Sequence, residues 1–531
     1  MSRPGPIGRM PWWLALPAAA LGGLGLDAAT PAVDWWPAAL IGAALIVAAL
    51  WQQRARFGLL VGFVAGAAFW MPHIHWLTLY LGPVPWLGLS GVMIAWFALF
   101  GLFAALATAG LARLRARPSA IVLAQALTVA GLWVAREQVQ STWPYGGFAW
   151  GRIAITQADG PLVALASWLG FAGLSGLLVF GCALVVAILA RPNMLVTKRL
   201  LAIVAIAAAF AGLSFVPPAT LESEGTLRIA AVQGNSKSAI FDDRENGDVI
   251  RDHIEATSAL LDDLEAKGDR VDLIVWPENS GEFQLPEQHY RSLELQRLAK
   301  RAGAPIVAGS VLQHPDGTFT NSTVVFDEQG DSGLRYDKRR PVPFAEYMPN
   351  RPFFRSLAPD LVDLVQLEYS FGQLPAVLPI ETSAGEIRAG IAICFDIIFD
   401  DHAVALMNGG GDAAEVILAQ TNNADFGHTD QSAQQLQIAK LRAVETGRAL
   451  VNISTVGTSA VVLPNGEEVD RLTPFTAGAM VAEVPLVTGQ TPALRFGSVI
   501  AGAWLALAAA GMLLSLAAGR GRRAPDSGEP R

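Results

Sequence analysis

Long apolar segments restrict the folds available to this chain more than any other feature of its sequence. They lie near residues 12–30, 37–51, 57–72, 86–111, 119–135, 161–190, 199–216 and 496–518. A helix that crosses a bilayer needs about 20 mainly apolar residues. The pattern therefore predicts a polytopic helical membrane domain of about eight spans, with one polar region inserted before the last span.

The polar region, residues 217–490, has the composition of an ordinary globular domain. Only 16% of the whole chain is charged and 52% is hydrophobic, whereas soluble proteins carry about 25% charged residues. The deficit falls almost entirely within the apolar segments. The net charge of −8 supplies no basic field, so we expect no nucleic-acid partner.

The distribution of Lys and Arg between the predicted spans indicates an orientation. Basic residues occur before the first span, in alternate loops and after the last span, at Arg9, Arg54–Arg56, Arg113–Arg117, Arg191–Arg199 and Arg520–Arg523. The intervening loops 31–36 and 73–85 contain none. Cytoplasmic loops are enriched in Lys and Arg. Both termini are therefore predicted to be cytoplasmic, and the polar region to be extracytoplasmic.

These observations divide the chain into four parts. We expect an N-terminal transmembrane domain of about seven helices at 1–216, an extracytoplasmic domain at 217–490, a C-terminal transmembrane helix at 491–518 and a cytoplasmic tail at 519–531. In the polar domain, helices are expected near 246–266, 289–302 and 429–447. The expected strands are 227–232, 271–276, 305–311, 322–327, 388–394, 415–419, 449–454 and 459–463. This alternation predicts a layered α/β fold.

Three residues of the polar domain form a candidate nucleophilic site. Cys394 ends an apolar run, Glu278 follows Trp-Pro, and Lys338 follows Tyr-Asp. A thiol attacks as its thiolate and needs a base or a cation nearby. Glu278 offers the base, and Lys338 offers a cation that also stabilises an oxyanion. Each residue alone has an ordinary structural explanation, but their combination in one domain favours catalysis.

The second cysteine, Cys182, lies in an apolar segment, where a packed thiol is the expected role. The sequence contains no CxxC motif or Cys/His cluster, so no metal site or cofactor is predicted.

Several longer motifs resemble known families. The polar domain resembles the nitrilase superfamily, which uses Glu-Lys-Cys on an αββα sandwich, and the added spans make the chain similar to bacterial apolipoprotein N-acyltransferases. The matching segments are Val232–Asn235, Trp276–Glu278, Tyr336–Lys338, Val342–Tyr347, Ile393–Asp396, Gly147–Trp150 and the helix with Gln434, Lys440–Ala443, Glu445 and Arg448.

The resemblance implies a role for each matching residue. Glu278 would be the general base, Lys338 the oxyanion-stabilising cation and Cys394 the nucleophile. The substrate-binding residues it implies are Glu346 as an accessory acid, Phe395 and Asp396 behind the nucleophile, and Phe241 and Trp150. For the Trp143–Trp150 loop, an interfacial aromatic belt and a wall of a lipid site both remain open.

Some positions depart from the family pattern. Phe395-Asp396 stands where Tyr-Glu is common, Asp425 stands where Trp precedes Phe-Gly, and Phe241 stands where Trp is usual. The Glu278, Lys338 and Cys394 set is intact, so we expect activity and leave the lipid contacts open.

The implied reaction is the last step of bacterial lipoprotein maturation. Cys394 would take an acyl chain from a phospholipid such as phosphatidylethanolamine, form a thioester, and pass the chain to the N-terminal α-amine of a diacylglyceryl-cysteine apolipoprotein. The location would be the inner membrane, with the catalytic domain in the periplasm. Two alternatives remain at this stage: a membrane-tethered amidase or nitrilase acting on a small C–N substrate, and a non-catalytic lipid- or lipoprotein-binding module.

The apolar segment Arg351–Val365 follows Glu346 and has two interpretations: an entry arm that dips into the membrane interface, or a loop packed on the sheet.

Overall fold

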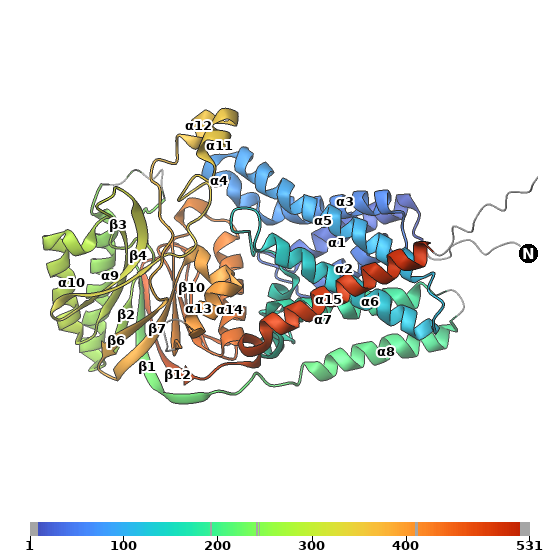
Figure 1. The fold of residues 1–531 in the computed structure, drawn as a ribbon. Helices are drawn as coiled ribbons and strands as arrows, with labels where there is room; N and C mark the ends of the chain where they lie inside the picture. The colour runs from blue at the N-terminus through green and yellow to red at the C-terminus, as the bar shows by residue number, and fades with distance from the viewer. Residues whose placement is uncertain (1–8, 192–193, 240–242, 244, 409–412, 521–531) are drawn as a thin grey trace, which may run out of the picture.

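The computed structural model describes residues 9–191, 194–239, 243, 245–408 and 413–520, and it divides into a helical bundle and a β-sandwich (Figure 1). Among the described residues the bundle has eight long helices: α1 (Trp12–Ala28), α2 (Pro37–Leu50), α3 (Ala55–His73), α5 (Pro83–Leu111), α6 (Pro118–Gln140), α7 (Ala166–Leu189), α8 (Val196–Leu213) and α15 (Pro492–Arg520). Proline, which is favoured in the first helical turn, begins four of them.

Six of these helices, α3, α5, α6, α7, α8 and α15, are long and apolar enough to cross a membrane. Helices α1 and α2 contain only 17 and 14 residues. The predicted apolar segments are thus all helical, although two of them are shorter than a full bilayer span.

The polar region forms two six-stranded sheets. The first has the order β12-β1-β2-β3-β4-β5 and the second has the order β11-β10-β9-β8-β7-β6. The first contains β12 (Gly478–Thr488), β1 (Glu222–Gln233), β2 (Leu273–Val275), β3 (Ile306–Gln313), β4 (Phe319–Asp327) and β5 (Gly330–Asp337). The second contains β11 (Glu468–Leu472), β10 (Ser459–Val462), β9 (Ala449–Ser454), β8 (Val416–Thr421), β7 (Gly385–Ile393) and β6 (Val377–Thr382).

Helices cover the outer faces of both sheets, which gives the αββα sandwich expected for a nitrilase-like domain. Helices α9 (Asp248–Lys267) and α10 (His289–Ala302) cover the first sheet, and α13 (Asp400–Asn408) and α14 (Gln431–Thr446) cover the second. Helix α14 also packs against α7 of the bundle, so this layer lies between the second sheet and the bundle (Figure 1).

A single apolar core joins the two halves. It begins on the facing sides of the sheets, at residues such as Val275 and Ile391, continues through Leu436 and Ala443 of α14, and extends into the bundle at Phe171. The sandwich is therefore fixed on the bundle by packed side chains as well as by the covalent chain.

Of the twelve strands in the described part of the chain, the sequence predicted eight, and it missed β5, β6, β11 and β12. Strand β5 is exposed in its first half and has a polar sequence, so it lacks the apolar run by which a buried strand is recognised. Of the predicted cytoplasmic tail, residues 519–520 belong to α15 and the remainder lies outside the described residues.

Candidate active site

The nucleophile candidate stands at a sharp turn directly after a buried strand. Strand β7 ends at Ile393, and Cys394 begins the 3₁₀ turn η5 (Cys394–Ile398) with a φ of 47°. A non-glycine residue in this left-handed region is strained by about 1–2 kcal/mol. The surrounding structure must therefore hold the turn in place.

Asp396 holds the beginning of that turn. Its Oδ2 accepts hydrogen bonds from the Tyr336 hydroxyl at 2.7 Å and from the Ile393 amide at 3.2 Å. Its Oδ1 accepts one from the Arg340 amide at 2.9 Å. Asp396 is fully buried, so these donors replace the water that its carboxylate would otherwise need.

The opposite sheet supplies the base and the cation. Glu278 follows β2 and Lys338 follows β5, and Lys338 Nζ lies 3.1 Å from Glu278 Oε1. Both side chains are buried. Glu278 Oε2 accepts a hydrogen bond from the Asn422 amide at 2.7 Å, so both oxygens of this carboxylate are oriented.

Glu346 completes this charged cluster. Its Oε1 lies 2.9 Å from Lys338 Nζ, and its Oε2 accepts a hydrogen bond from the Val342 amide at 2.6 Å. Asn321 Nδ2 bridges the two carboxylates, donating to Glu278 Oε1 at 2.7 Å and to Glu346 Oε1 at 2.9 Å. One ammonium and one amide thus hold two carboxylates together.

Burial sets the protonation states of the three central groups. It raises the pKa of the Cys394 thiol to about 12, and the charge of Glu278 adds to the rise while Lys338 opposes it. Burial likewise raises the pKa of Glu278 against the pull of Lys338. Burial alone would lower the pKa of Lys338, but Glu278 and Glu346 raise it well above its usual value. The environment therefore favours a protonated thiol at Cys394 and a charged ammonium at Lys338, with Glu278 as the acceptor between them.

The other residues predicted for substrate binding lie around the nucleophile turn. Phe395 stacks on Phe148 of the bundle with ring centroids 6.4 Å apart. Phe148 in turn stacks on Trp150, which is only 3% exposed and donates from its indole to Gln434 Oε1 at 2.9 Å. Phe241 lies outside the described residues.

The two ends of the Trp143–Trp150 loop lie in different surroundings. Trp143 is 61% exposed at the edge of the bundle, whereas Trp150 is buried where the bundle meets the sandwich. The segment Arg351–Val365 contains both packed and exposed aromatic side chains. It forms α11 (Arg351–Leu357) and α12 (Pro359–Val362), in which Phe354 packs on Phe344 and Phe353 is 58% exposed.

Sequence reasoning missed Asn321, Asn422 and Gln435. The signal for Asn321 was available, because an amide in a buried strand needs a partner. Nothing in the sequence indicated that Asn422 would donate through its backbone. Within the described ranges, no group of three or more His, Cys, Asp or Glu side chains is placed to hold a metal ion.

Comparison with known proteins identifies the family. Residues 22–184 match the apolipoprotein N-acyltransferase N-terminal domain, and residues 228–492 match the carbon–nitrogen hydrolase domain. The chain is 32% identical to the apolipoprotein N-acyltransferase of Mycolicibacterium smegmatis over 543 residues, covering 96% of this chain and 86% of that protein. It is 30% identical to that of Azotobacter vinelandii over 515 residues, covering 93% of each.

Among solved structures, the carbon–nitrogen hydrolase from Helicobacter pylori G27 matches 53% of this chain and 94% of its own, at 17% identity and a TM-score of 0.36. The amidase from Nesterenkonia sp. AN1 matches at 18% identity and a TM-score of 0.34, over 51% of this chain and 95% of its own.

An apolar helical bundle joined to a carbon–nitrogen hydrolase sandwich defines a membrane-bound enzyme of the nitrilase type. Its site contains a carboxylate, an ammonium and a thiol. The chain belongs to the apolipoprotein N-acyltransferase family. It is thus an acyltransferase of lipoprotein biosynthesis.

Proposed function

We propose that Cys394 carries the acyl chain as a thioester between a phospholipid donor and the α-amine of an apolipoprotein. In the first half-reaction Glu278 takes the thiol proton as Cys394 Sγ attacks the ester carbonyl carbon. The carbon–oxygen bond then breaks, and Glu278 returns the proton to the departing lysophospholipid. Lys338 stabilises the negative charge that develops on the carbonyl oxygen.

In the second half-reaction the neutral α-amine attacks the thioester carbonyl. Glu278 takes one proton from the amine and returns it to Cys394 Sγ as the carbon–sulfur bond breaks, which leaves an amide. An α-amine has a pKa of about 7.7–8.0, so a useful neutral fraction exists near neutral pH. The two substrates bind in turn, which predicts ping-pong kinetics.

The observation that carries this proposal is the buried contact between Lys338 and Glu278 beside a protonated thiol. A thiol with a pKa of about 12 is unreactive unless a base removes its proton during attack. Glu278 is suited to that task because its own pKa is raised, which reduces the difference between the proton donor and the acceptor.

A phospholipid donor, with phosphatidylethanolamine as the first candidate, is supported by an apolar groove on the bundle. The groove has a volume of about 530 Å³ and is lined mainly by side chains of α3 and α5, among them Phe63, Met71, Leu87 and Ile94. Short α4 (Thr78–Leu81) lies between these helices in the chain. Trp76, just before α4, packs against Phe426 of the sandwich with ring centroids 5.0 Å apart, so this end of the bundle lies beside the sandwich.

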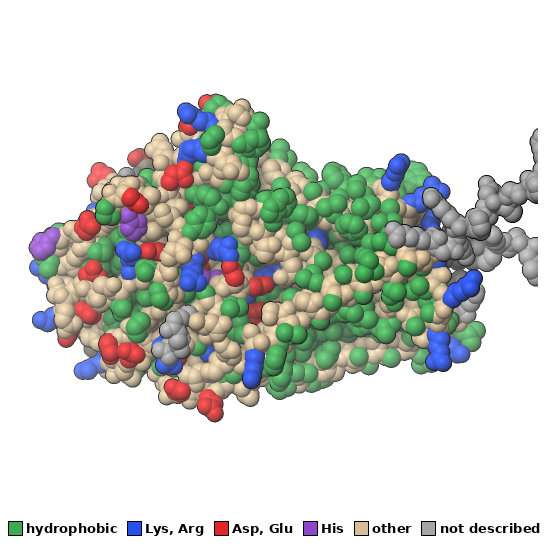
Figure 2. Space-filling view, viewed as in Figure 1, with side chains coloured by type: hydrophobic (Ala, Val, Ile, Leu, Met, Phe, Trp, Pro, Cys, Tyr) green, Lys and Arg blue, Asp and Glu red, His purple; other side chains and the backbone are tan. Residues whose placement is uncertain are grey.

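The distribution of charge supports a periplasmic sandwich with both termini in the cytoplasm. Figure 2 shows Lys and Arg side chains gathered at the end of the bundle farthest from the sheets, with a green apolar flank between them and the sandwich. The basic loops before α3 and after α5 contribute Arg54, Arg113 and Arg115. By the positive-inside rule this end is cytoplasmic. We therefore assign 1–216 and 491–518 to the inner membrane, 217–490 to the periplasm and 519–531 to the cytoplasm.

Mass spectrometry of the intact protein tests the reaction. The purified full-length chain is incubated with phosphatidylethanolamine, beside Cys394→Ala. We expect a fatty-acyl mass gain on the wild type alone, discharged by a diacylated lipopeptide. Discharge by water alone would contradict the transfer step, and absence of the adduct on folded protein would overturn the Cys394 mechanism.

Cysteine labelling in whole cells tests the orientation. In a Cys394→Ala background, Lys267→Cys in the sandwich and Arg115→Cys in the bundle loop each present one exposed thiol. A reagent that passes the outer membrane but not the inner one should label the first and not the second. The reverse pattern would overturn the proposed orientation.

A further inference from the structure

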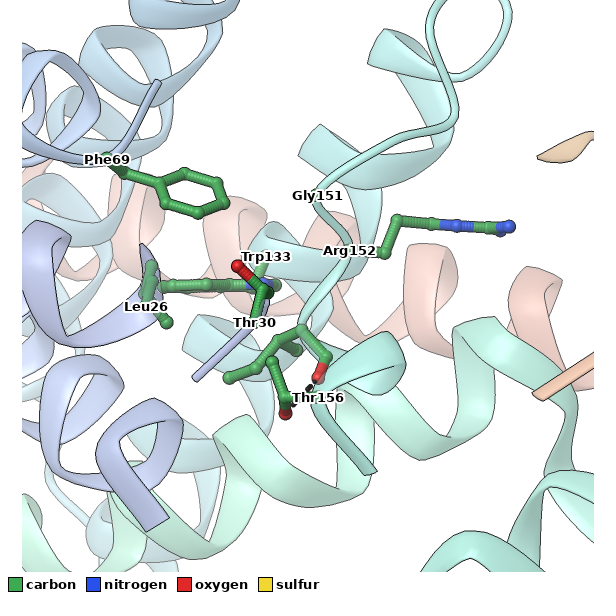
Figure 3. Close-up of a pocket in the computed structure, with 8 residues that line it drawn as sticks. Leu26, Thr30, Phe69, Trp133, Gly151, Arg152 and Thr156 are labelled. Carbon is green, nitrogen blue, oxygen red and sulfur yellow. Dashed lines mark hydrogen bonds between the residues drawn. The ribbon is translucent and has the colours of Figure 1, made fainter. Parts of the chain in front are cut away.

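Arg152 belongs to the bundle by sequence, yet its guanidinium reaches the end of the nucleophile turn. Nη1 donates to both carboxylate oxygens of Asp400 at 2.8 Å, and Nη2 donates to the Ile398 carbonyl at 3.1 Å. Ile398 is the last residue of the turn that Cys394 begins. In Figure 3 the Arg152 side chain points away from the other residues that line a small cavity of about 10 Å³ in the bundle.

Arg442 of α14 binds the same backbone from the other side. Its Nε donates to the Ile397 carbonyl at 3.3 Å, and its Nη2 donates to the Ile398 carbonyl at 3.2 Å and to Asp400 Oδ1 at 3.1 Å. Two guanidinium groups, one from each half of the molecule, thus converge on a single carbonyl and a single carboxylate.

Phe171 of α7 lies against both guanidinium groups. Its ring centroid lies 4.1 Å from Arg152 Cζ and 4.3 Å from Arg442 Cζ, so both cations lie against one aromatic ring. Gly170 has a φ of 64°, and a Cβ there would lie 3.0 Å from Glu445 Oε1. That same oxygen accepts a hydrogen bond from the Phe171 amide at 3.3 Å. The non-helical conformation of Gly170 interrupts α7 and thereby sets the position of the Phe171 ring.

The two guanidinium groups are balanced by two carboxylates, Asp400 and Glu445, and this pairing stabilises the buried charges. Arg152 and Arg442 are each 1% exposed, and buried charges persist only when they are paired. Asp400 faces both cations, and Glu445 forms an ion pair with Arg442. Loss of Arg152 would leave Asp400 with one guanidinium and would free one side of the Ile398 carbonyl.

Because Cys394 has a strained φ, the contacts of Arg152 and Arg442 with the end of its turn affect the position of the nucleophile. Asp396 fixes the beginning of the turn from within the sandwich, whereas the end of the turn is fixed by Arg152 and Arg442. A left-handed residue relaxes when either end is released. A displacement of about 1 Å in a reacting group reduces a rate by about 100-fold.

We infer that Arg152 is a positioning residue for acyl transfer, through which the membrane domain fixes the conformation of the nucleophile turn. The inference rests on the proposed role of Cys394 as the acyl carrier. Arg152 touches neither substrate nor thiol in this scheme, and it acts only through the Ile398 carbonyl and Asp400.

The test compares full-length Arg152→Gln and Arg152→Lys with the wild type and with a matched control. The control is Arg388→Gln, which removes the ion pair with Glu415 near the start of β7, away from the nucleophile turn. Three quantities are measured for each: the rate and donor KM of acyl-enzyme formation from phosphatidylethanolamine, the rate of Cys394 alkylation by iodoacetamide, and the midpoint of thermal unfolding.

We expect Arg152→Gln to lower the acylation rate by about 10- to 100-fold and to change the alkylation rate, with little change in KM. Arg152→Lys should fall between it and the wild type, because an ammonium cannot reproduce the two-point fork. Arg388→Gln should lose thermal stability without losing either rate.

A folded Arg152→Gln with wild-type acylation and alkylation rates would overturn the inference, as would equal rate losses in Arg388→Gln. If Arg152→Gln does not fold, the same rates are measured on Arg152→Lys. Wild-type acylation and alkylation rates in that variant would overturn the inference. Failure of the wild type itself to form an acyl-enzyme would instead refute the proposed function.

Discussion

Gln435 Nε2 donates a hydrogen bond to the Cys394 carbonyl at 2.9 Å and lies 3.7 Å from Cys394 Sγ. The amide cannot turn freely, because its Oε1 accepts hydrogen bonds from Asn423 at 2.8 Å and from Gln431 at 3.3 Å. This contact lowers the pKa of Cys394 against the larger effect of burial. Gln435 is therefore placed to stabilise the thiolate as it forms.

Replacing Gln435 with Leu should slow acyl-enzyme formation by about tenfold or more, because a hydrogen bond to a charged group contributes about 1.5–3 kcal/mol. The measurement is the rate of mass gain with phosphatidylethanolamine. Gln437→Leu is the control, since Gln437 lies on the same helix and binds Asp34 of the bundle instead. Equal rates in the two variants would contradict this role.

Replacing Glu278 with Gln should lower the pKa of the Cys394 thiol and yet abolish acyl transfer. The negative charge of Glu278 adds to the burial that raises the pKa of Cys394, so removing the charge lowers that pKa. Alkylation of Cys394 by iodoacetamide should then be faster than in the wild type at about pH 9. Acyl transfer should be lost because no base remains. Slower alkylation in a folded variant would contradict the electrostatic argument.

Replacing Lys338 with Met should destabilise the protein in a pH-dependent way. Burial and the charge of Glu346 both raise the pKa of Glu278, and Lys338 opposes them. A carboxyl whose folded pKa exceeds its unfolded value of about 4.3 favours the folded state below that value, and this stability is lost as the pH rises through the folded pKa. Breaking a buried pair costs about 3–5 kcal/mol.

The unfolding midpoint of Lys338→Met should therefore fall further below that of the wild type at pH 8 than at pH 5. Lys338→Arg, which keeps the positive charge, is the control and should show a much smaller dependence on pH. A deficit of equal size at both pH values would mean that Glu278 is not an unpaired charge in the variant.

Asp396 is an example of how much of this site could be predicted from the sequence. Its place after Cys394 was visible in the motif, but its partners Tyr336 and Arg340 come from strand β5 of the opposite sheet and from the loop after it. The same limit applies to Lys338, which follows a strand, β5, without an apolar run, and to Arg152, which belongs to the bundle. Local patterns predicted the apolar helices and the buried strands. Contacts between distant segments depend on how the sheets and the bundle pack together, which no local pattern records.

Replacing Asp396 with Ala should destabilise the sandwich by about 3 kcal/mol or more, because it leaves three donors, two of them fully buried, without an acceptor. Asp401→Asn is the control, since Asp401 is 58% exposed and pairs only at the surface. A change of less than about 0.5 kcal/mol is usual for such a site. Equal changes in unfolding free energy would contradict the anchoring role of Asp396.

Phe353 and Phe354 allow the two interpretations of α11 to be tested separately. Phe354 packs against Phe344 at 4.9 Å and Tyr145 at 5.9 Å between ring centroids, whereas Phe353 is 58% exposed. Helix α11 lies where the sandwich meets the bundle, with Phe354 against Tyr145 of the bundle (Figure 1). An exposed aromatic ring at this level is suited to the membrane interface.

Phe353→Ser should therefore raise the KM for phosphatidylethanolamine in vesicles by several-fold, about 1 kcal/mol, and leave the unfolding midpoint unchanged. Phe354→Ser should lower the unfolding midpoint instead, because it removes packed aromatic area. Tyr290→Ser is the control, since Tyr290 is 69% exposed on α10 at the far side of the sandwich. A KM for Phe353→Ser equal to that of the Tyr290 control would show that α11 is packed against the sheet without acting as an entry arm for lipid.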